Sequence, residues 1–342
     1  MTQLLRANQE LFRRTPDECF ESLESLATHC QRQKDESQDC WKAPLDLAAI
    51  VGREGRLSLS LGTDGDCLMN DWSFGQLCRL SSVAKETVNR LRPETACQVF
   101  AETLPRTTKP LQLFTQGDLI RSIHGTSYTR LYNSDVVEML RGTAADFEPP
   151  QRAFNGATGL YVGEQDLFCF LIDPLGWTEI EGEAFAPGFF VWNSEVGRRS
   201  FGVQTFWLQA VCQNHIVWDA IEVVEFSRKH TASVQNSLDE MRRLLAALIA
   251  KRDQRKDAFV RVVAQAMKQS LGEDADEALQ ALAAHGINRG LAKQALAIAR
   301  ERGRFTIFSL VDALTRLSGK LECAGDRLEL DQRASALLAL AV

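Results

Sequence analysis

The decapeptide Trp192–Phe201, WNSEVGRRSF, places a polar turn and two adjacent arginines between two strongly apolar segments. The flanking segments, APGFFVW and GVQTFWLQAVC, both have the composition of β-strands. A planar guanidinium suits the recognition of a phosphate, so Arg198 or Arg199 is a candidate phosphate ligand. The alternative is that one arginine pairs with Glu195 across the turn and the other is solvated. If the strand extends back to the arginines, alternation places their side chains on opposite faces of the sheet.

A second basic stretch, SRKHT, directly precedes a long helical pattern. Thr231 can cap that helix, and free N–H groups at a helix N-terminus attract anions, so Arg228, Lys229 and His230 are candidate phosphate ligands. The alternative is a helix cap with incidental charges. We expect Arg199, Arg228 and Lys229 to converge in one anion groove. Two further arginines, Arg121 and Arg130, are candidate nucleic-acid contacts.

Residue patterns typical of catalysis or metal binding are weak in this chain. Cys212 and His215 lie three residues apart in an extended segment, so they point to opposite faces and make a poor catalytic dyad. The segment TDGDCLMNDW superficially resembles a nuclease or calcium loop, but it lacks the closing glutamate of an EF-hand and predicts a turn followed by a helix cap. No phosphate-binding glycine motif or nucleophile elbow is present. We therefore expect no catalytic residue and no cofactor. We also expect no metal site, because no ligand spacing occurs among the five histidines, His29, His124, His215, His230 and His285.

The composition describes a globular protein with an uneven charge distribution. The 342 residues carry a net charge of −6, yet residues 228–268 hold ten Lys/Arg and four Asp/Glu. That segment is a local basic surface on an otherwise acidic chain, and the ordinary alternative is a solvated helix face. Nine irregularly spaced cysteines, with no Cys-x-x-Cys, predict reduced thiols. No apolar run has transmembrane length and no secretory signal begins the chain, so we expect a cytoplasmic protein without a membrane partner.

The elements that must position these residues follow from local patterns. Residues 1–34 are expected to be helical, and residues 45–61 form a hairpin around a glycine-bounded turn. Short helices are predicted over 73–103, one of them with a capping box that starts at Ser73. A second hairpin is predicted over 111–123, followed by a helix from Asn133 or Ser134 to Gly142.

The middle of the chain predicts an antiparallel sheet, and its end predicts helices. Four apolar segments between residues 157 and 212 are separated by Gly and Pro, whereas apolar residues recur every three or four positions from 237 to 271. The predicted fold class is α+β, with a curved antiparallel β-sheet packed by helices and a helical C-terminal region. The predicted divisions are an N-terminal helical segment over 1–40, an α+β core domain over 41–231 and the helical region over 232–342.

Several of these motifs together resemble a known family. PGFFVWNSEVGRRSFGVQTFWLQAVCQNHIVW, FSRKHT before a long helix, and FTIFSLVDALTRLS are similar, in this order, to the phage/plasmid-like protein family, which is catalogued as a domain of unknown function. The resemblance extends over about residues 45–340. It implies, by a further analogy, a distant relationship to single-strand annealing proteins.

The leading functional hypothesis is a non-catalytic nucleic-acid-binding protein of phage or plasmid type, which binds or anneals single-stranded DNA. Such proteins need no cofactor, because a basic groove follows the phosphates and aromatic side chains stack on bases. Annealing proteins commonly form rings or filaments, so a homo-oligomer is also expected. The principal alternative is a scaffold protein whose basic helix docks an acidic partner. An enzyme that uses carboxylates such as Asp64 and Asp66 is the least supported hypothesis.

Overall fold

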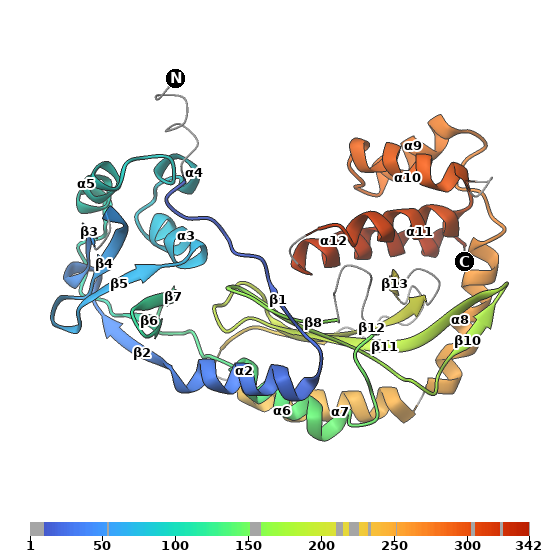
Figure 1. Cartoon of the computed structure of the whole chain (residues 1–342), viewed down its shortest axis with the longest axis horizontal. Coiled ribbons are helices and arrows are strands. Elements are labelled where there is room, and N and C mark those ends of the chain that lie inside the picture. Colours follow the sequence, from blue (N-terminus) through green and yellow to red (C-terminus); the bar gives the residue numbers. More distant parts are fainter. Residues whose placement is uncertain are drawn as a thin grey trace.

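The computed structural model of the chain confirms the α+β class, with two antiparallel-rich sheets, covering helices and a helical C-terminal region (Figure 1). It describes residues 10–52, 55–150, 159–209, 215–218, 226–231, 234–250, 252–301, 305–321 and 324–341. Cys212 and Asn214 of the VCQNH segment lie outside these ranges, as does Lys251.

The larger sheet is built around a long hairpin. Its strands follow the order β1 (Glu18–Phe20), β8 (Leu160–Val162), β9 (Leu167–Ile172), β11 (Glu183–Asn193), β12 (Phe201–Gln209) and β13 (His215–Trp218). Two short strands extend it, β10 (Thr178–Ile180) beside β11 and β14 (Phe226–Arg228) beside β12. All the described pairs in this sheet are antiparallel.

Both faces of the larger sheet are covered, which explains why β9 and β12 are buried along their whole length. One face, with Phe189, Val191 and Val203, packs against the helices α2 (Leu23–Asp35), α6 (Asn133–Thr143) and α7 (Ser237–Ala250). The opposite face carries an aromatic cluster that includes Phe170 and Phe190. Helix α12 (Ala324–Ser335) lies on that side, so the sheet separates α7 from α12 (Figure 1).

The smaller sheet has the order β2 (Ser37–Lys42), β6 (Leu111–Gln116), β7 (Leu119–His124), β5 (Asp66–Met69), β4 (Leu57–Ser60) and β3 (Ala48–Val51). Its described pairs are antiparallel except for β5 with β7. Helices α3 (Asp71–Leu80), α4 (Lys85–Val88) and α5 (Pro93–Thr103) accompany it, and α3 and α5 contribute buried side chains to its core. Both predicted hairpins are therefore present, as β3–β4 and β6–β7.

The acidic segment 63–72 differs from its prediction in one respect. It contains the strand β5 as well as a turn and a helix start. The capping box of α3 joins Asn70 and Ser73, so the N-cap is Asn70 and the helix begins three residues earlier than predicted. A strand of four residues between two turns carries too few positions to show its period in the sequence.

The C-terminal region is helical, as predicted, and the predicted long helix corresponds to two described elements. Helix α7 ends at Ala250 and α8 (Arg252–Ala266) follows. The remaining helices are α9 (Ala275–Ala284), α10 (Arg289–Glu301), α11 (Ile307–Ser318) and α12. Helix α11 is buried along almost its entire length and forms the centre of this layer.

The expected helix over residues 1–34 is interrupted, because the strand β1 precedes α2. The boundary at residue 40 lies within β2, because α2 ends at Asp35 and the strand begins at Ser37. The boundary at 231 lies between β14 and α7. Within the described ranges, no helix is long and apolar enough to cross a membrane.

Candidate nucleic-acid interface at the junction of the two sheets

The turn that connects β11 to β12 is buried and holds the two sheets together. Asn193 and Ser194 are fully buried, and Glu195 is 2% exposed. The amide of Asn193 donates to the Leu131 carbonyl and to Asn133 Oδ1, each at 2.9 Å. The Ser194 hydroxyl donates to the Gln165 carbonyl at 2.5 Å. The polar residues of this turn therefore face inward and satisfy buried partners.

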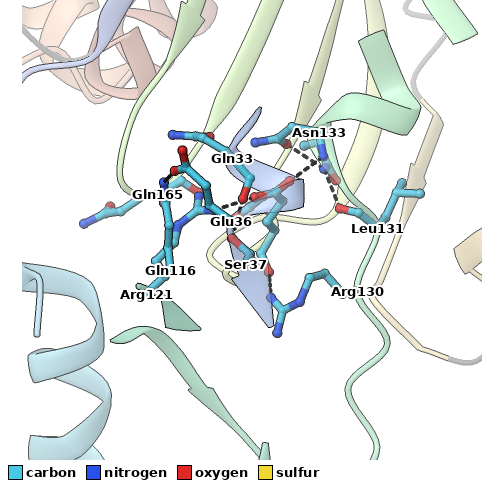
Figure 2. A network of polar contacts seen from close by, with 12 residues as sticks. Gln33, Glu36, Ser37, Gln116, Arg121, Arg130, Leu131, Asn133 and Gln165 are labelled. Carbon is cyan, nitrogen blue, oxygen red and sulfur yellow. Dashed lines mark hydrogen bonds and ion pairs between the residues drawn. The ribbon is translucent and has the colours of Figure 1, made fainter. Parts of the chain in front are cut away.

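Glu195 takes part in a polar network, of which Figure 2 labels Arg121, Arg130 and Asn133. Its carboxylate accepts a hydrogen bond from the Asn133 backbone N–H at 2.7 Å, and it lies 3.0 Å from Nη1 of Arg121. Its backbone carbonyl accepts hydrogen bonds from the Tyr128 hydroxyl, at 2.8 Å, and from the Arg130 guanidinium. The partner of Glu195 is thus Arg121 from the smaller sheet, and the expected pair with Arg198 or Arg199 is not formed.

Arg121 and Arg130 are internal side chains. Arg130 also pairs with Asp39 of β2 at 2.9 Å, and both guanidinium groups approach the ring of Phe114, at 4.9 Å for Arg121 and 3.5 Å for Arg130. A cation over an aromatic face is stabilised by the ring quadrupole. These two arginines therefore support the junction from within rather than presenting their charges to solvent.

Three stacked rings lie next to this network. The rings of His124 and Tyr128 stack with centroids 3.7 Å apart and 8° between their planes, and His230 continues the stack at 5.5 Å from Tyr128. Gly197 has a φ of +72°, and a Cβ placed on it would lie 2.7 Å from Cε1 of His124. Glycine is required there both by its backbone conformation and by the close approach of the ring.

Burial keeps both histidines of the stack neutral. Desolvation lowers the pKa of His124 to about 3, and the nearby positive charge of Arg130 contributes in the same direction. Desolvation also lowers the pKa of His230 to about 4, although backbone groups of Thr129 and Arg199 act in the opposite direction. The stack is therefore an uncharged aromatic group at neutral pH, with His230 buried and the rings of His124 and Tyr128 partly exposed.

Cationic and aromatic side chains border the stack at the surface. Trp72 of α3 donates its indole N–H to the Val196 carbonyl at 2.9 Å, and the Arg79 guanidinium lies 5.0 Å from its ring. Lys229, adjacent to His230 in the chain, is exposed. Residues from the smaller sheet's helices and from the larger sheet thus meet at one edge of the junction.

Arg198 and Arg199 converge on one buried carboxylate. Arg198 Nη1 lies 2.5 Å from Asp166 Oδ2, and Arg199 Nε lies 3.6 Å from Asp166 Oδ1. Burial raises the pKa of Asp166, while the two arginines oppose that effect. The alternation expected for the arginines does not apply, because β12 begins at Phe201 and the preceding residues belong to the turn.

The expected convergence of Arg199, Arg228 and Lys229 is not observed for the side chains. Arg199 reaches Glu329 of α12 at 3.2 Å, whereas Arg228 reaches Glu240 of α7 at 2.6 Å. The two helices lie on opposite sides of the larger sheet (Figure 1). The backbones are nevertheless close, because Arg228 is the antiparallel partner of Phe201.

Sequence reasoning missed several residues of this junction. Trp72, Arg79, His124 and Tyr128 were not among the candidate nucleic-acid contacts, because no local motif places them beside one another. A weak sequence signal for the stack is that His124 and Tyr128 lie four residues apart after a strand. The turn at Gly197, which these rings approach closely, is near them in space but not in sequence.

The described part of the chain contains no group of three or more His, Cys, Asp or Glu that could hold a metal ion. Asp64, from the acidic segment, pairs with Lys42 at 3.0 Å and accepts a hydrogen bond from the Cys40 thiol at 3.3 Å. The cysteines whose positions are described are free thiols. His215 lies in β13, and Cys212 falls outside the described residues, so the Cys212–His215 arrangement stays a sequence-based prediction.

Residues 121–300 match the model of a family described as Domain of unknown function (DUF932). The chain belongs to the DUF932 family. No curated protein and no solved structure matches the chain. The DUF932 segment starts at Arg121 in β7 and includes the stacked rings, the turn at Glu195 and the SRKHT stretch. Trp72 and Arg79, which complete the edge of the junction, lie before the DUF932 segment.

Proposed function

We propose that this protein binds single-stranded nucleic acid without catalysis, at the junction of the two sheets. The observation that carries the proposal is the neutral ring stack of His124, Tyr128 and His230 beside exposed cations. Proteins that hold single strands without sequence preference combine aromatic rings, on which bases stack, with cations that neutralise phosphates.

The side chains of the junction would have three different roles. Arg79 and Lys229 are exposed and would contact phosphates directly. Arg198, Arg199 and Arg228 would exchange a carboxylate partner for a phosphate, at the cost of the existing ion pairs. Arg121 and Arg130 would act from beneath by fixing the turn that carries Gly197 and Arg198.

The resemblance noted from the sequence suggests a more specific form of this function. It favours DNA over RNA, an annealing activity of phage or plasmid type, and a homo-oligomer in the cytoplasm. The alternative of a scaffold that docks an acidic protein through its basic helices predicts binding to an acidic polypeptide and no preference for nucleic acid.

The test is fluorescence anisotropy with labelled single- and double-stranded oligonucleotides, at low and moderate salt. The variant Arg79→Glu/Lys229→Glu should weaken single-strand binding and reduce the log–log salt slope by roughly 0.7 for each lost phosphate contact. The matched control is Arg289→Glu/Lys293→Glu, which makes the same change in net charge at exposed positions of α10.

An equal loss of binding in both double variants would show that net charge, rather than the junction, controls binding. Binding of the unmodified protein should persist in EDTA, since phosphate contacts by cations need no metal. If the unmodified protein binds neither oligonucleotide at low salt, the proposed function is wrong.

A further inference from the structure

A cavity lies in the smaller sheet's helical cover, away from the junction. It has a volume of about 450 Å³ and is lined by residues from three segments: the chain near Phe12, the β3–β4 hairpin near Arg56, and the connection from α4 to α5. None of its lining residues belongs to the network of Glu195 or to the ring stack. This volume lies within the range of pockets that bind small molecules.

The walls of this cavity are fixed by hydrogen bonds. Asn89 is buried, and its side chain accepts from the Phe12 N–H and donates to the Phe12 carbonyl, both at 2.8 Å. The Leu11 N–H donates to the Asn89 carbonyl at 2.9 Å. Phe12 and Leu57 are buried in the core below and supply an apolar base. The cavity is therefore formed without a ligand.

The charge of the lining is opposite in sign to that of the protein. Arg56, Arg90 and Arg92 face the cavity, and Glu10 is the acidic residue of the lining. The whole chain, in contrast, has a net charge of −6. Neither Arg56 nor Arg92 has an ion-pair partner among the described residues. Cations that gather around a concave surface without internal partners are typical of an anion site.

The start of α5 adds to the positive potential. Pro93 is the first residue of the helix and lines the cavity, and no side chain caps this end. The N-terminus of a helix attracts anions through its unsatisfied N–H groups and its dipole. Glu94 follows in the first turn but is not part of the lining.

We propose that this cavity, hereafter the arginine pocket, binds a phosphate monoester that carries an apolar or aromatic group, such as a nucleoside monophosphate. The guanidinium groups of Arg56 and Arg92 would hold the phosphate, for which their planar donors are suited. The apolar base formed by Phe12 and Leu57 would hold the attached ring. Such a phosphate occurs on a free mononucleotide and on the 5′-end of an oligonucleotide.

The experiment is calorimetric titration of the full chain with inorganic phosphate, with a nucleoside 5′-monophosphate and with the unphosphorylated nucleoside. The monophosphate should bind more tightly than either inorganic phosphate or the nucleoside. Arg56→Gln/Arg92→Gln should weaken its binding at least about tenfold, since each lost charge-assisted hydrogen bond is worth more than a neutral one. Both side chains are exposed, so the fold should persist, and circular dichroism would verify this.

Two comparisons are needed. The first distinguishes this site from the junction, and the second distinguishes a free mononucleotide from a strand end as the source of the phosphate. Arg79→Glu/Lys229→Glu should leave the affinity for the monophosphate unchanged, even if it abolishes oligonucleotide binding. An advantage of a 5′-phosphorylated over an unphosphorylated oligonucleotide, lost in Arg56→Gln/Arg92→Gln, would identify a strand end as the source of the phosphate. Absence of monophosphate binding at millimolar concentration, or equal affinity of the unmodified protein and Arg56→Gln/Arg92→Gln, would overturn the proposal.

Discussion

Glu195 shows how a residue that the sequence places on a polar turn can act as part of the core. Its carboxylate and its carbonyl together contact Arg121, Asn133, Tyr128 and Arg130. A buried carboxylate is tolerated only when charge and hydrogen bonds compensate for lost hydration. The contacts of Glu195 provide that compensation, and they come from segments more than 60 residues away.

Glu195→Gln should destabilise the protein strongly. The substitution keeps the size of the side chain but leaves the buried Arg121 without its counter-charge, and breaking a buried pair costs about 3–5 kcal/mol. Urea unfolding followed by tryptophan fluorescence would measure the free energy of unfolding. The matched control is Glu240→Gln, which removes an exposed partner of Arg228 and should cost less than about 1 kcal/mol. Similar losses in both variants would contradict the role assigned to Glu195.

At the scale of the elements, the β11–β12 hairpin carries the junction. Its turn contacts the loop before α6 through Tyr128, and α3 through Trp72. The left-handed conformation of Gly197 lets the chain pass against the face of His124. The turn can hold the two sheets against each other because Gly197 fixes the backbone conformation of the turn.

Gly197→Ala should destabilise the protein more than the same change at another left-handed glycine. An alanine in this conformation costs about 1–2 kcal/mol, and its Cβ would also overlap the ring of His124. Gly117→Ala is the control, because Gly117 has a φ of +57° and no neighbouring atom lies within 4 Å of the position that a Cβ would take. Unfolding free energies of the two variants would be compared, and a smaller loss at Gly197 than at Gly117 would contradict the close approach.

At the scale of the whole molecule, the two sheets are joined by polar groups and rings, of which Arg121, Arg130 and Glu195 are buried. Asp39, Arg121, Arg130 and Glu195 form this contact together with the stacked histidines. Such a junction depends on the protonation states of its groups. The stability of the protein should therefore depend on pH through the junction.

Acidification should destabilise the fold through His124 and His230. The folded protein keeps both rings neutral, with pKa values of about 3 and about 4, while the unfolded chain protonates them near pH 6.5. The unfolded state thus binds more protons between about pH 6.5 and pH 4, so the free energy of unfolding falls as the pH falls. The slope is at most about 1.4 kcal/mol per pH unit for each histidine.

Urea unfolding between pH 4.5 and pH 7.5 would measure this slope. His124→Gln/His230→Gln should reduce it, whereas His285→Gln, a control at the end of α9, should leave it in place. An unchanged slope in the double variant would show that other groups cause the acid sensitivity.

Local patterns predicted much of the fold. The hairpins β3–β4 and β6–β7 follow from turn residues between short apolar runs, and the β-rich middle and helical end follow from their periods. The strand β5 was missed because four residues carry too little periodic signal, and the long helix predicted after 237 proved to be α7 and α8. The choice of Arg121 and Arg130 as nucleic-acid contacts rested on residue type, which does not report burial.

The sequence by itself determined the α+β class, the family and the position of the turn between β11 and β12, because each depends on residues that are neighbours in the chain. The tertiary structure decided which charged side chains are exposed to solvent. Arg121 and Arg130 became internal while Lys229 stayed exposed, since their partners Glu195 and Asp39 come from segments that are distant in the chain. Likewise, the side chains of Arg199 and Arg228 reach helices on opposite sides of the larger sheet. Burial and pairing are set by packing between segments far apart in sequence, and no local spacing encodes them.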